Sequence, residues 1–360
     1  MITKLPIKDD SMELIKKSGK NKMKSLVDKA NKTSHKRKIT ILIILLAICL
    51  ASFLISVSKG SLDISISQVI KAIFMENDTV NHQIIWNIRF PRTLVAGLVG
   101  ICLALSGAIL QGVMRNPLAA PNIIGVSSGA GLVAYIIMIL FPSYYYLVPL
   151  GAFVGALSST IFIYLLAWKD GINPMRLVLA GVAVSSLLGA GINSLMTFFP
   201  DRIAGVIGFM VGGLSARTWP HFNMLWPYAA LGIAITFLLP KKLNILMLGD
   251  EIATGLGLNV ERTRLLFIIL ASLLAASAVS VVGLLGFVGL IVPHTARLII
   301  GSDYRYLFPA TAILGATVVM LCDTVARLVF DPVEIPVGIV MSILGAPFFL
   351  YLLRERKAME

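Results

Sequence analysis

The chain has 360 residues, of which 57% are hydrophobic and 14% charged, and its formal net charge at pH 7 is +13. Its mean hydropathy is +0.88. This composition excludes a soluble globular protein and is typical of a polytopic membrane protein, because a bilayer core requires spans of about 20 apolar residues. The three cysteines lie in apolar runs without paired spacing, which indicates neither a disulfide framework nor a zinc site.

Residues 1–38 form a basic segment that carries 12 of the 31 Lys and Arg residues. Because the segment is rich in Lys, Asn and Ser and has no periodic apolar pattern, we expect a disordered cytoplasmic tail. Charges placed next to the first apolar run are better explained by membrane orientation and contact with anionic lipid headgroups than by DNA binding. The expected partner is therefore the lipid bilayer and not a nucleic acid.

Ten apolar runs follow this tail, and they predict an all-α fold of about ten transmembrane helices. The eighth run is short, and its glycines together with Pro293 predict a bent or broken helix. The expected spans are 39–57, 93–113, 123–141, 147–168, 177–199, 221–239, 265–285, 286–300, 307–330 and 335–353.

The charges between the runs predict the orientation of the chain in the membrane. Cytoplasmic segments carry an excess of Lys and Arg, and ten crossings place both termini on one side. With the basic tail inside, 24 of the 31 Lys and Arg residues are cytoplasmic, including those of loop 240–264 and of the C-terminal end, 354–360. The sequence thus predicts an N-in, C-in membrane domain over 39–353. The outer cations are Lys59, Lys71, Arg89, Arg92, Arg202, Arg217 and Arg327.

Two of these outer cations begin the second span, in the stretch NIRFPRTL. Pro91 suits the first turn of a helix, and Arg89 and Arg92 are three residues apart, so that a helical turn would project both from one face. One interpretation is that they reach phosphate headgroups by snorkelling. The other is that they dock an acidic partner on the outer side.

The string GVSSG, residues 125–129, matches the G-x-S-x-G pattern of serine hydrolases. An intramembrane serine hydrolase, with His294 as base, is therefore one alternative. That pattern requires a strand-to-helix turn, however, and here it lies in an apolar helical run. Close packing of helices through small side chains is the favoured interpretation.

Loop 240–264 is the longest predicted cytoplasmic connection, and it contains the stretch LGDEIATGLGLN. Acidic residues suit the first turn of a short helix there, and Leu248, Ile252 and Leu256 would form an apolar stripe. Such a helix needs a surface to cover its stripe. A protein partner is favoured over the membrane surface, because the acidic start disfavours contact with anionic lipid.

The stretch GLIVPHTARLIIGSDYR, residues 289–305, gathers charged residues at the inner end of the broken span. His294 there could relay protons, which would indicate a proton-coupled secondary carrier. A structural role at the kink of Pro293 is favoured. Near the outer end of span nine, Asp323 and Arg327 are spaced i, i+4 and could form an ion pair.

Several long strings of the chain resemble the FecCD family, the membrane permease subunits of ATP-driven importers for iron-siderophores, haem and vitamin B12. The resemblance covers about residues 40 to 353. It rests on RFPRTLVAGLVGICLALSGAILQGVMRNPLAAPNIIGVSSGAG, LVLAGVAVSSLLGA, LNILMLGDEIATGLGL, GLLGFVGLIVPHTARLIIGSDYRYLFP and DPVEIPVGIVMSILGAPFFLYLL.

The resemblance implies the fold of the vitamin B12 importer permease, a type II ABC importer. It also implies a second permease subunit (a copy or a relative), two cytoplasmic ATPase subunits and an external substrate-binding protein. Arg89, Arg92 and Arg327 match the family's outer arginines, which are expected to dock glutamates of the binding protein. The family's coupling helix, which sits in a cleft of the ATPase, matches Leu248, Gly249, Asp250, Glu251, Ile252, Ala253, Gly255, Leu256 and Gly257.

A Walker A motif, G-x-x-x-x-G-K-[ST], does not occur in the sequence. We therefore expect a transport subunit without catalytic residues, cofactor or metal of its own, with ATP and Mg²⁺ bound by the partner ATPase. The expected cargo is an iron(III)-siderophore, with haem or vitamin B12 as the alternatives. The candidates for the translocation path and outer gate are Asn193, Ser194, Phe198, Gly212 and Gly213. The alternative role for these residues is tight helix packing.

Overall fold

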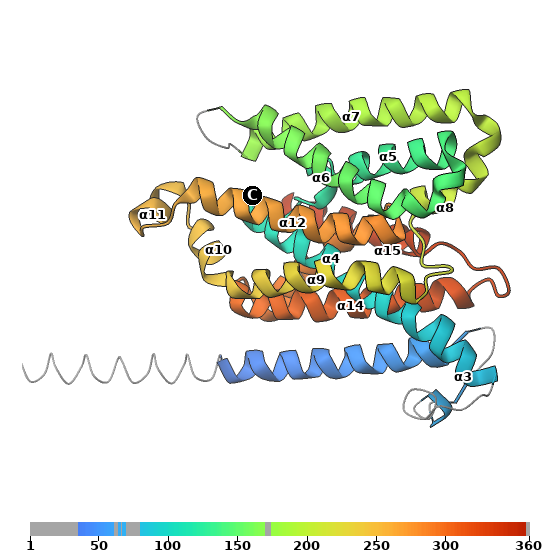
Figure 1. Cartoon of the computed structure of the whole chain (residues 1–360). Coiled ribbons are helices and arrows are strands. Elements are labelled where there is room, and N and C mark those ends of the chain that lie inside the picture. Colours follow the sequence, from blue (N-terminus) through green and yellow to red (C-terminus); the bar gives the residue numbers. More distant parts are fainter. Residues whose placement is uncertain (1–34, 61–63, 66, 70–79, 170–173, 358–360) are drawn as a thin grey trace, which may run out of the picture. The chain divides into compact units, whose positions relative to one another are not determined.

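A computed structural model of the chain describes residues 35–60, 64–65, 67–69, 80–169 and 174–357 (Figure 1). The chain divides into two compact units, Met1–Ile44 and Leu45–Glu360. In the first unit, the described residues are helical and belong to a helix over His35–Ser58. Residues 1–34 of the predicted tail and residues 358–360 of the predicted C-terminal end lie outside the described residues.

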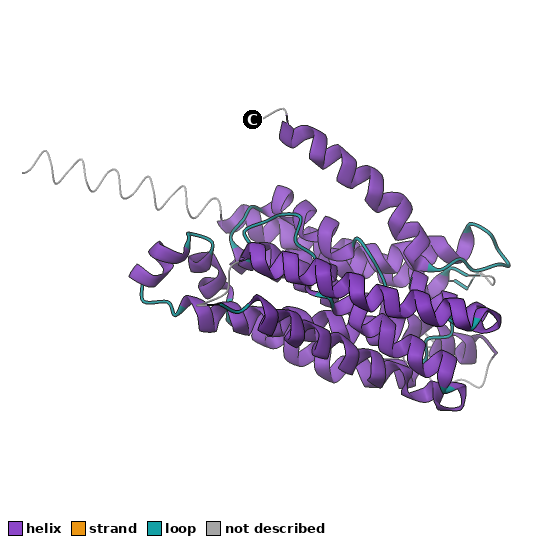
Figure 2. Cartoon of the chain, turned by 90° about the horizontal axis from the view of Figure 1, so that it is seen from above, coloured by secondary structure: helices purple, strands orange, loops and turns teal. Residues whose placement is uncertain are grey.

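The second unit is helical, and its described residues contain no β-strand (Figure 2). Its first elements are α3 (Val80–Ile84), the π-helix η1 (Ile85–Arg89), α4 (Phe90–Val113), η2 (Pro121–Ile124), α5 (Val126–Leu140), η3 (Pro142–Leu147), α6 (Val148–Ala167) and α7 (Pro174–Phe198). They are followed by η4 (Pro200–Gly205), α8 (Ile207–Val211), α9 (Trp219–Leu238), α10 (Pro240–Leu246), α11 (Asp250–Gly255), α12 (Val260–Val282), α13 (Val288–Ile300), α14 (Tyr304–Leu328) and α15 (Val337–Lys357).

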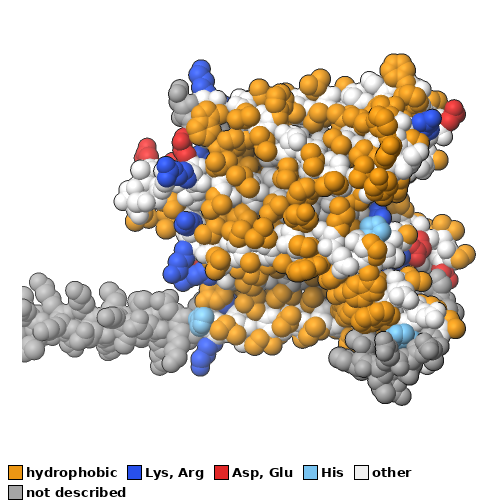
Figure 3. Space-filling view, viewed as in Figure 1, with side chains coloured by type: hydrophobic (Ala, Val, Ile, Leu, Met, Phe, Trp, Pro, Cys, Tyr) orange, Lys and Arg blue, Asp and Glu red, His pale blue; other side chains and the backbone are white. Residues whose placement is uncertain are grey.

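The predicted all-α, multi-pass membrane fold is confirmed, and apolar helices lie at the approximate places of the predicted spans. Seven helices of the described chain are long and apolar enough to cross a membrane, and three shorter apolar helices, α5, α13 and part of α15, account for the other expected spans. Figure 3 shows the corresponding surface: apolar side chains cover the middle of the face in view, and charged side chains gather toward its two ends.

The eighth span is short, as predicted, and the chain is interrupted before it, whereas α13 itself is one continuous helix. Helix α12 ends at Val282, a loop follows, and α13 begins at Val288 and has only 13 residues. Gly283 adopts a φ of +79°, in the left-handed region that favours glycine, and ends α12. Pro293 lies inside α13.

Helix α4 is the central helix of the second unit. It contacts α14, α12, α13 and α9, and most of its residues are buried. Small residues permit this close packing, because a Cβ added at Gly100 would collide with the carbonyl of Gly315, and one added at Gly107 would collide with the carbonyl of Gly289. The packing of the neighbouring helices against α4 therefore requires their backbones to approach closely.

The GVSSG string serves the same kind of packing. A Cβ added at Gly129 of α5 would collide with the carbonyl of Gly155 in α6, and the hydroxyl of Ser159 donates to the carbonyl of Gly125. Ser127 donates to Asn122. The string follows the 3₁₀-helix η2 and not a strand, so the strand-to-helix turn of a serine hydrolase is missing from this described segment.

Replacing Gly100 with Ala should lower the thermal midpoint of unfolding, because the added methyl group separates α4 from α14. Gly189 of α7 is the matched control, since a Cβ added there meets no atom within 4 Å. Gly189→Ala should leave the midpoint unchanged or raise it, because Ala favours helix by about 1 kcal/mol relative to Gly. Equal midpoints for the two purified variants would contradict this explanation of the packing.

Candidate functional site

Arg92 lies at the centre of a buried ionic cluster at the predicted outer end of α4 and α14. Its Nε and Nη2 donate to the two carboxylate oxygens of Asp323 at 3.0 and 2.9 Å. Its Nη1 donates to Glu334 at 2.8 Å, in the connection between α14 and α15. The guanidinium group of Arg92 thus connects α14 with the loop after it. Its partners Asp323 and Glu334 lie 231 and 242 residues further along the chain.

The other two predicted arginines bind the end of the helix His35–Ser58. Arg89, the last residue of η1, donates to the carbonyls of Val57 and Ser58 at 3.3 and 2.8 Å. Arg327 donates to the carbonyl of Ser56 at 2.9 Å and to that of Lys59 at 3.1 Å. The last carbonyls of a helix lack intrahelical partners, so these arginines cap it.

The three arginines therefore do not project into solvent or lipid as the spacing suggested. Each is only 6% exposed, and Arg89 and Arg92 bind different partners, so they do not act as a pair on one helical face. The i, i+4 ion pair between Asp323 and Arg327 is present at 3.3 Å. Docking of an external protein to this arginine cluster (Arg89, Arg92 and Arg327) stays a prediction.

Glu334 is the member of the cluster that the sequence interpretation missed. Its side chain is 37% exposed, whereas that of Asp323 is 1% exposed. Burial acts to raise the pKa of Glu334, but hydrogen bonds from Arg92 and Ser215 and the charge of Arg92 lower it below its usual value. This stabilisation is present above about pH 4.3, the usual pKa of Glu, and is lost as the pH falls through the lowered pKa.

The predicted coupling helix is present as α11, at the opposite end of the second unit in Figure 1. Its apolar stripe is solvent-exposed, with Leu248, Ile252 and Leu256 at 54, 56 and 60% exposure. The helix is shorter than the stretch Leu248–Gly257, because Gly249 adopts a φ of +106° immediately before it, and the helix ends at Gly255.

Asp250 anchors α11 to the rest of the chain. Its carboxylate accepts from Nη2 of Arg264 in α12 at 2.9 Å, and Arg115, just after α4, lies at 3.4 Å. The side chain of Arg264 is 3% exposed. Of the two acidic residues that the sequence placed in the first turn, Asp250 therefore holds the helix in place, and Glu251 is exposed.

A second polar contact, at the same end of the bundle as α11, connects α10 with the start of α14. Asn244 of α10 donates to Asp303 at 2.8 Å and accepts from the backbone N–H of Tyr304 at 3.0 Å. Partial burial acts to raise the pKa of Asp303, but hydrogen bonds from Arg305 and Asn244 lower it to about 2. The start of α14 is thereby tied to the helix that leads into α11.

His294, in α13, packs against a side chain of another helix. Its ring meets Phe348 of α15 with the two ring centroids 6.3 Å apart. Arg297, one turn later, donates to Gln111 of α4 at 3.2 Å. These contacts agree with the structural role that the sequence favoured for this stretch.

The path candidates fall in two separate places. Asn193, Ser194 and Phe198 are exposed on α7, and Phe198 is 76% exposed. Gly212 follows α8 with a φ of +80°, where its N–H and carbonyl join neighbouring backbone: it donates to Gly208 and accepts from Gly338. Gly213 lines a cavity, whereas the α7 residues do not.

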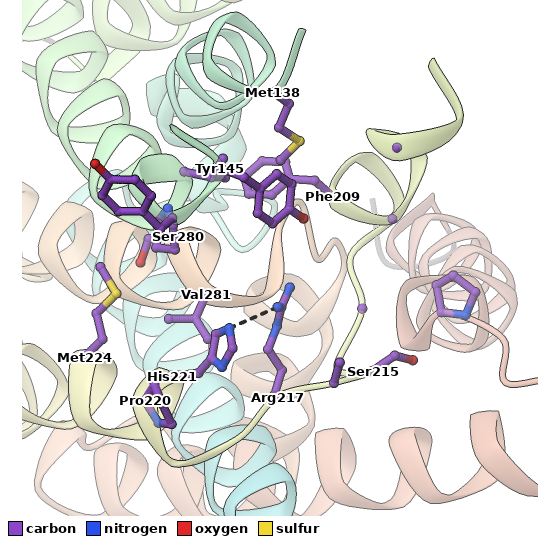
Figure 4. Close-up of a pocket in the computed structure, with 18 residues that line it drawn as sticks. Met138, Tyr145, Phe209, Ser215, Arg217, Pro220, His221, Met224, Ser280 and Val281 are labelled. Atoms are coloured by element: carbon purple, nitrogen blue, oxygen red, sulfur yellow. Dashed lines mark hydrogen bonds between the residues drawn. The ribbon is translucent and has the colours of Figure 1, made fainter. Parts of the chain in front are cut away.

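This cavity has a volume of about 620 Å³ and lies at the predicted outer end (Figure 4). Its walls come from η3, η4, α8, the segment 213–217, the first turns of α9 and the end of α12. The residues labelled in Figure 4 are Met138, Tyr145, Phe209, Ser215, Arg217, Pro220, His221, Met224, Ser280 and Val281. The sequence pointed to Gly213 but could not show that this residue lines a cavity.

The fold and the two charged ends define a multi-pass helical membrane protein, and the comparisons identify its class. The chain belongs to the FecCD transport family, whose model matches residues 46–355. It is 40% identical over 321 residues to the Fe(3+)-citrate import system permease protein YfmE of Bacillus subtilis, a match that covers 89% of this chain and 96% of that protein.

The chain is also 41% identical over 297 residues to the hemin transport system permease protein HmuU of Yersinia pestis, covering 78% of this chain and 86% of that one. A solved structure described as an inward-facing metal-chelate type ABC transporter matches with a TM-score of 0.79 and 31% identity, over 88% of this chain and 99% of that one. The chain is thus a permease of the ABC importers for iron chelates, haem or vitamin B12, in the bacterial cytoplasmic membrane.

Substitution of Asp323 by Asn should destabilise the permease by about 3–5 kcal/mol, because Arg92 and Arg327 would lose the buried carboxylate that both contact. Glu334→Gln should cost about 1 kcal/mol or less, because its carboxylate is partly solvated. Unfolding of the purified variants in lipid nanodiscs measures both effects. A smaller loss for Asp323→Asn than for Glu334→Gln would contradict the assignment of Asp323 as the buried carboxylate that Arg92 and Arg327 share.

Asp250→Ala should loosen α11 while leaving the membrane helices intact, because Arg264 and Arg115 would lose their shared carboxylate. Glu251→Ala removes the same charge from the next position and is the control. Amide hydrogen exchange in 248–257 should be faster in the first variant and unchanged in the second. Equal exchange in both variants would show that Asp250 does not anchor the helix.

Proposed function

We propose that this chain is the permease subunit of an importer for an iron(III)-siderophore chelate. The observation that supports this most is the family match over 46–355, nearly the entire second unit, with a 40% identical relative named for Fe(3+)-citrate import. Haem and vitamin B12 are the alternative cargoes, because relatives named for hemin and cobalamin are similarly identical in sequence.

The proposed importer contains two permease subunits around a central path, two cytoplasmic ATPase subunits and an external binding protein. The second permease is a copy or a relative of this chain. The exposed face of α7, which includes Asn193, Ser194 and Phe198, would then lie against the other subunit or the path. Transport is mechanical in this proposal: the binding of ATP by the partner subunits changes the side from which the path is open.

Coupling to the ATPases would occur through α11. Ile252 of this six-residue helix and the flanking Leu248 and Leu256 form an exposed apolar patch, which is typical of a protein interaction site. Asp250 holds the helix to α12. A partner that pushes on the stripe would move a helix that is tied by an ion pair to α12, the direct neighbour of α4.

Docking of the binding protein would use the arginine cluster in a different way from the one that the spacing suggested. Arg92 binds both carboxylates of this end, Asp323 and Glu334, and Arg327 also contacts Asp323. Glu334 is the exposed member of the cluster and could exchange with a carboxylate of the docking protein. Electrostatic complementarity of this kind favours association and orientation.

Cargo identity is tested by uptake in a strain that lacks this gene. Labelled iron-siderophore should enter the complemented strain and not the deletion strain, while labelled haem and vitamin B12 should enter both equally. Restoration of haem or vitamin B12 uptake alone would replace the proposed cargo. Restoration of none would contradict the importer proposal itself.

Replacing Ile252 by Asp should lower substrate-stimulated ATP hydrolysis of the assembled complex by about tenfold or more, because a charge would enter the apolar contact. Thr254→Ser on the same helix keeps the hydroxyl that donates to the carbonyl of Asp250 and should have no effect. A normal response of the Ile252→Asp complex would favour the alternative in which α11 lies on the membrane surface.

A further inference from the structure

The cavity at the predicted outer end contains a cation that forms no ion pair with a carboxylate of the described residues. Among the residues that line it, Arg217 is the only one with a permanent charge, and none is acidic. Nη1 of Arg217 donates to Nε2 of His221 at 3.3 Å, and its Nε is buried without a hydrogen-bond partner in the described chain. A donor without an acceptor in the described chain is available to a ligand that supplies one.

The neighbouring arginines differ from Arg217 because each of them has an oxygen acceptor. Arg92 and Arg327 contact Asp323, and Arg202 donates to the carbonyl of Ile139. Ser215 also lines the cavity, but its hydroxyl donates to Glu334, whose carboxylate binds Arg92. Burial, together with the positive charge of Arg92, lowers the pKa of Arg217, which indicates that its charge is poorly compensated.

The polar groups that could accompany an anion converge on the same side of the cavity. Figure 4 shows the side chains of Arg217 and Tyr145 pointing toward one another, with His221 beside the guanidinium group. His221 is held by its place in the first turn of α9, where Thr218 and His221 form a capping box. The fold therefore positions His221 next to Arg217 without a ligand.

The remaining walls are apolar and fit an organic molecule. Met138, Phe209, Met224 and Val281 face the space. A volume of about 620 Å³ lies within the range of small-molecule sites, roughly 300–1,000 Å³. Apolar walls with one guanidinium group suit a carboxylate-bearing molecule, since the planar fork of Arg binds carboxylates through two parallel hydrogen bonds.

We propose that this cavity binds a small carboxylate-bearing organic anion and that Arg217 anchors one of its carboxylates. The inference rests on the proposed function and deepens it, because it names the chemical class of the cargo as an anionic carboxylate chelate. The site would receive the cargo at the outer entrance of this subunit.

Binding of radiolabelled citrate to the purified permease in nanodiscs, without binding protein or ATPase, tests this inference. The wild type should bind citrate saturably, and trimethyl citrate, which carries no charge, should not compete. Arg217→Gln should weaken citrate binding at least about tenfold, because a charge-assisted pair is lost. Arg217→Lys should bind with intermediate affinity, because it keeps the charge and loses the fork.

Arg202→Gln is the matched control, because it removes an outer arginine that does not line the cavity and should bind citrate like the wild type. Arg217→Gln should fold normally, since no carboxylate of the described chain pairs with Arg217. An equal melting temperature of the two variants checks this.

The inference is overturned if the wild type does not bind citrate, if trimethyl citrate competes equally, or if Arg217→Gln binds as tightly as Arg202→Gln. It is also overturned if Arg217→Gln weakens only the docking of the binding protein, which would assign the arginine to a protein carboxylate. Because the assay requires no transport, Arg217-dependent citrate binding would support this site even if the uptake experiment contradicted the importer proposal.

Discussion

Asp323 provides the buried negative charge on which the predicted outer end of the second unit depends. Its carboxylate contacts Arg92 of α4 and Arg327 of its own helix, and its side chain is 1% exposed. Burying a charge is costly unless it is paired, so each member of this group requires the others. Arg327 extends the group to the last carbonyls of the helix His35–Ser58, where Arg89 also binds.

The cluster fixes geometry more than it adds stability, since buried ion pairs often contribute little compared with apolar residues of the same size. Arg92 donates a hydrogen bond to Glu334, and Glu334 also accepts one from Ser215 on the cavity wall. One set of polar contacts thus positions the arginine cluster and one wall of the cavity. Arg217, on the same wall, forms no ion pair with a carboxylate in the part of the chain that the structure describes.

Local patterns in the sequence predicted the features that depend on neighbouring residues. The ten apolar runs, the break before α13, the pair Asp323–Arg327 and the exposed stripe of α11 all follow from hydropathy or helical spacing. The partners of Arg92 could not be predicted in this way, because they lie 231 and 242 residues away. The same reason applies to Arg115 and Arg264, which meet at Asp250 only in the folded chain.

Burial was the second property that the sequence could not supply. The spacing of Arg89 and Arg92 suggested a projecting pair, but the π-helix η1 and the packing of α4 turn their side chains toward different partners. The sequence showed Arg217 as an outer cation, whereas the cavity beside it and its unpartnered Nε in the described chain appear only in the fold.

The most direct test of the central role of Asp323 is a double-mutant cycle with Arg92→Met and Asp323→Leu, measured by unfolding in nanodiscs. If the two residues form one buried unit, the double variant should be more stable than either single variant, with a coupling energy of about 2 kcal/mol or more. Additive losses, with no coupling energy, would contradict the pairing on which the outer end of the structure depends.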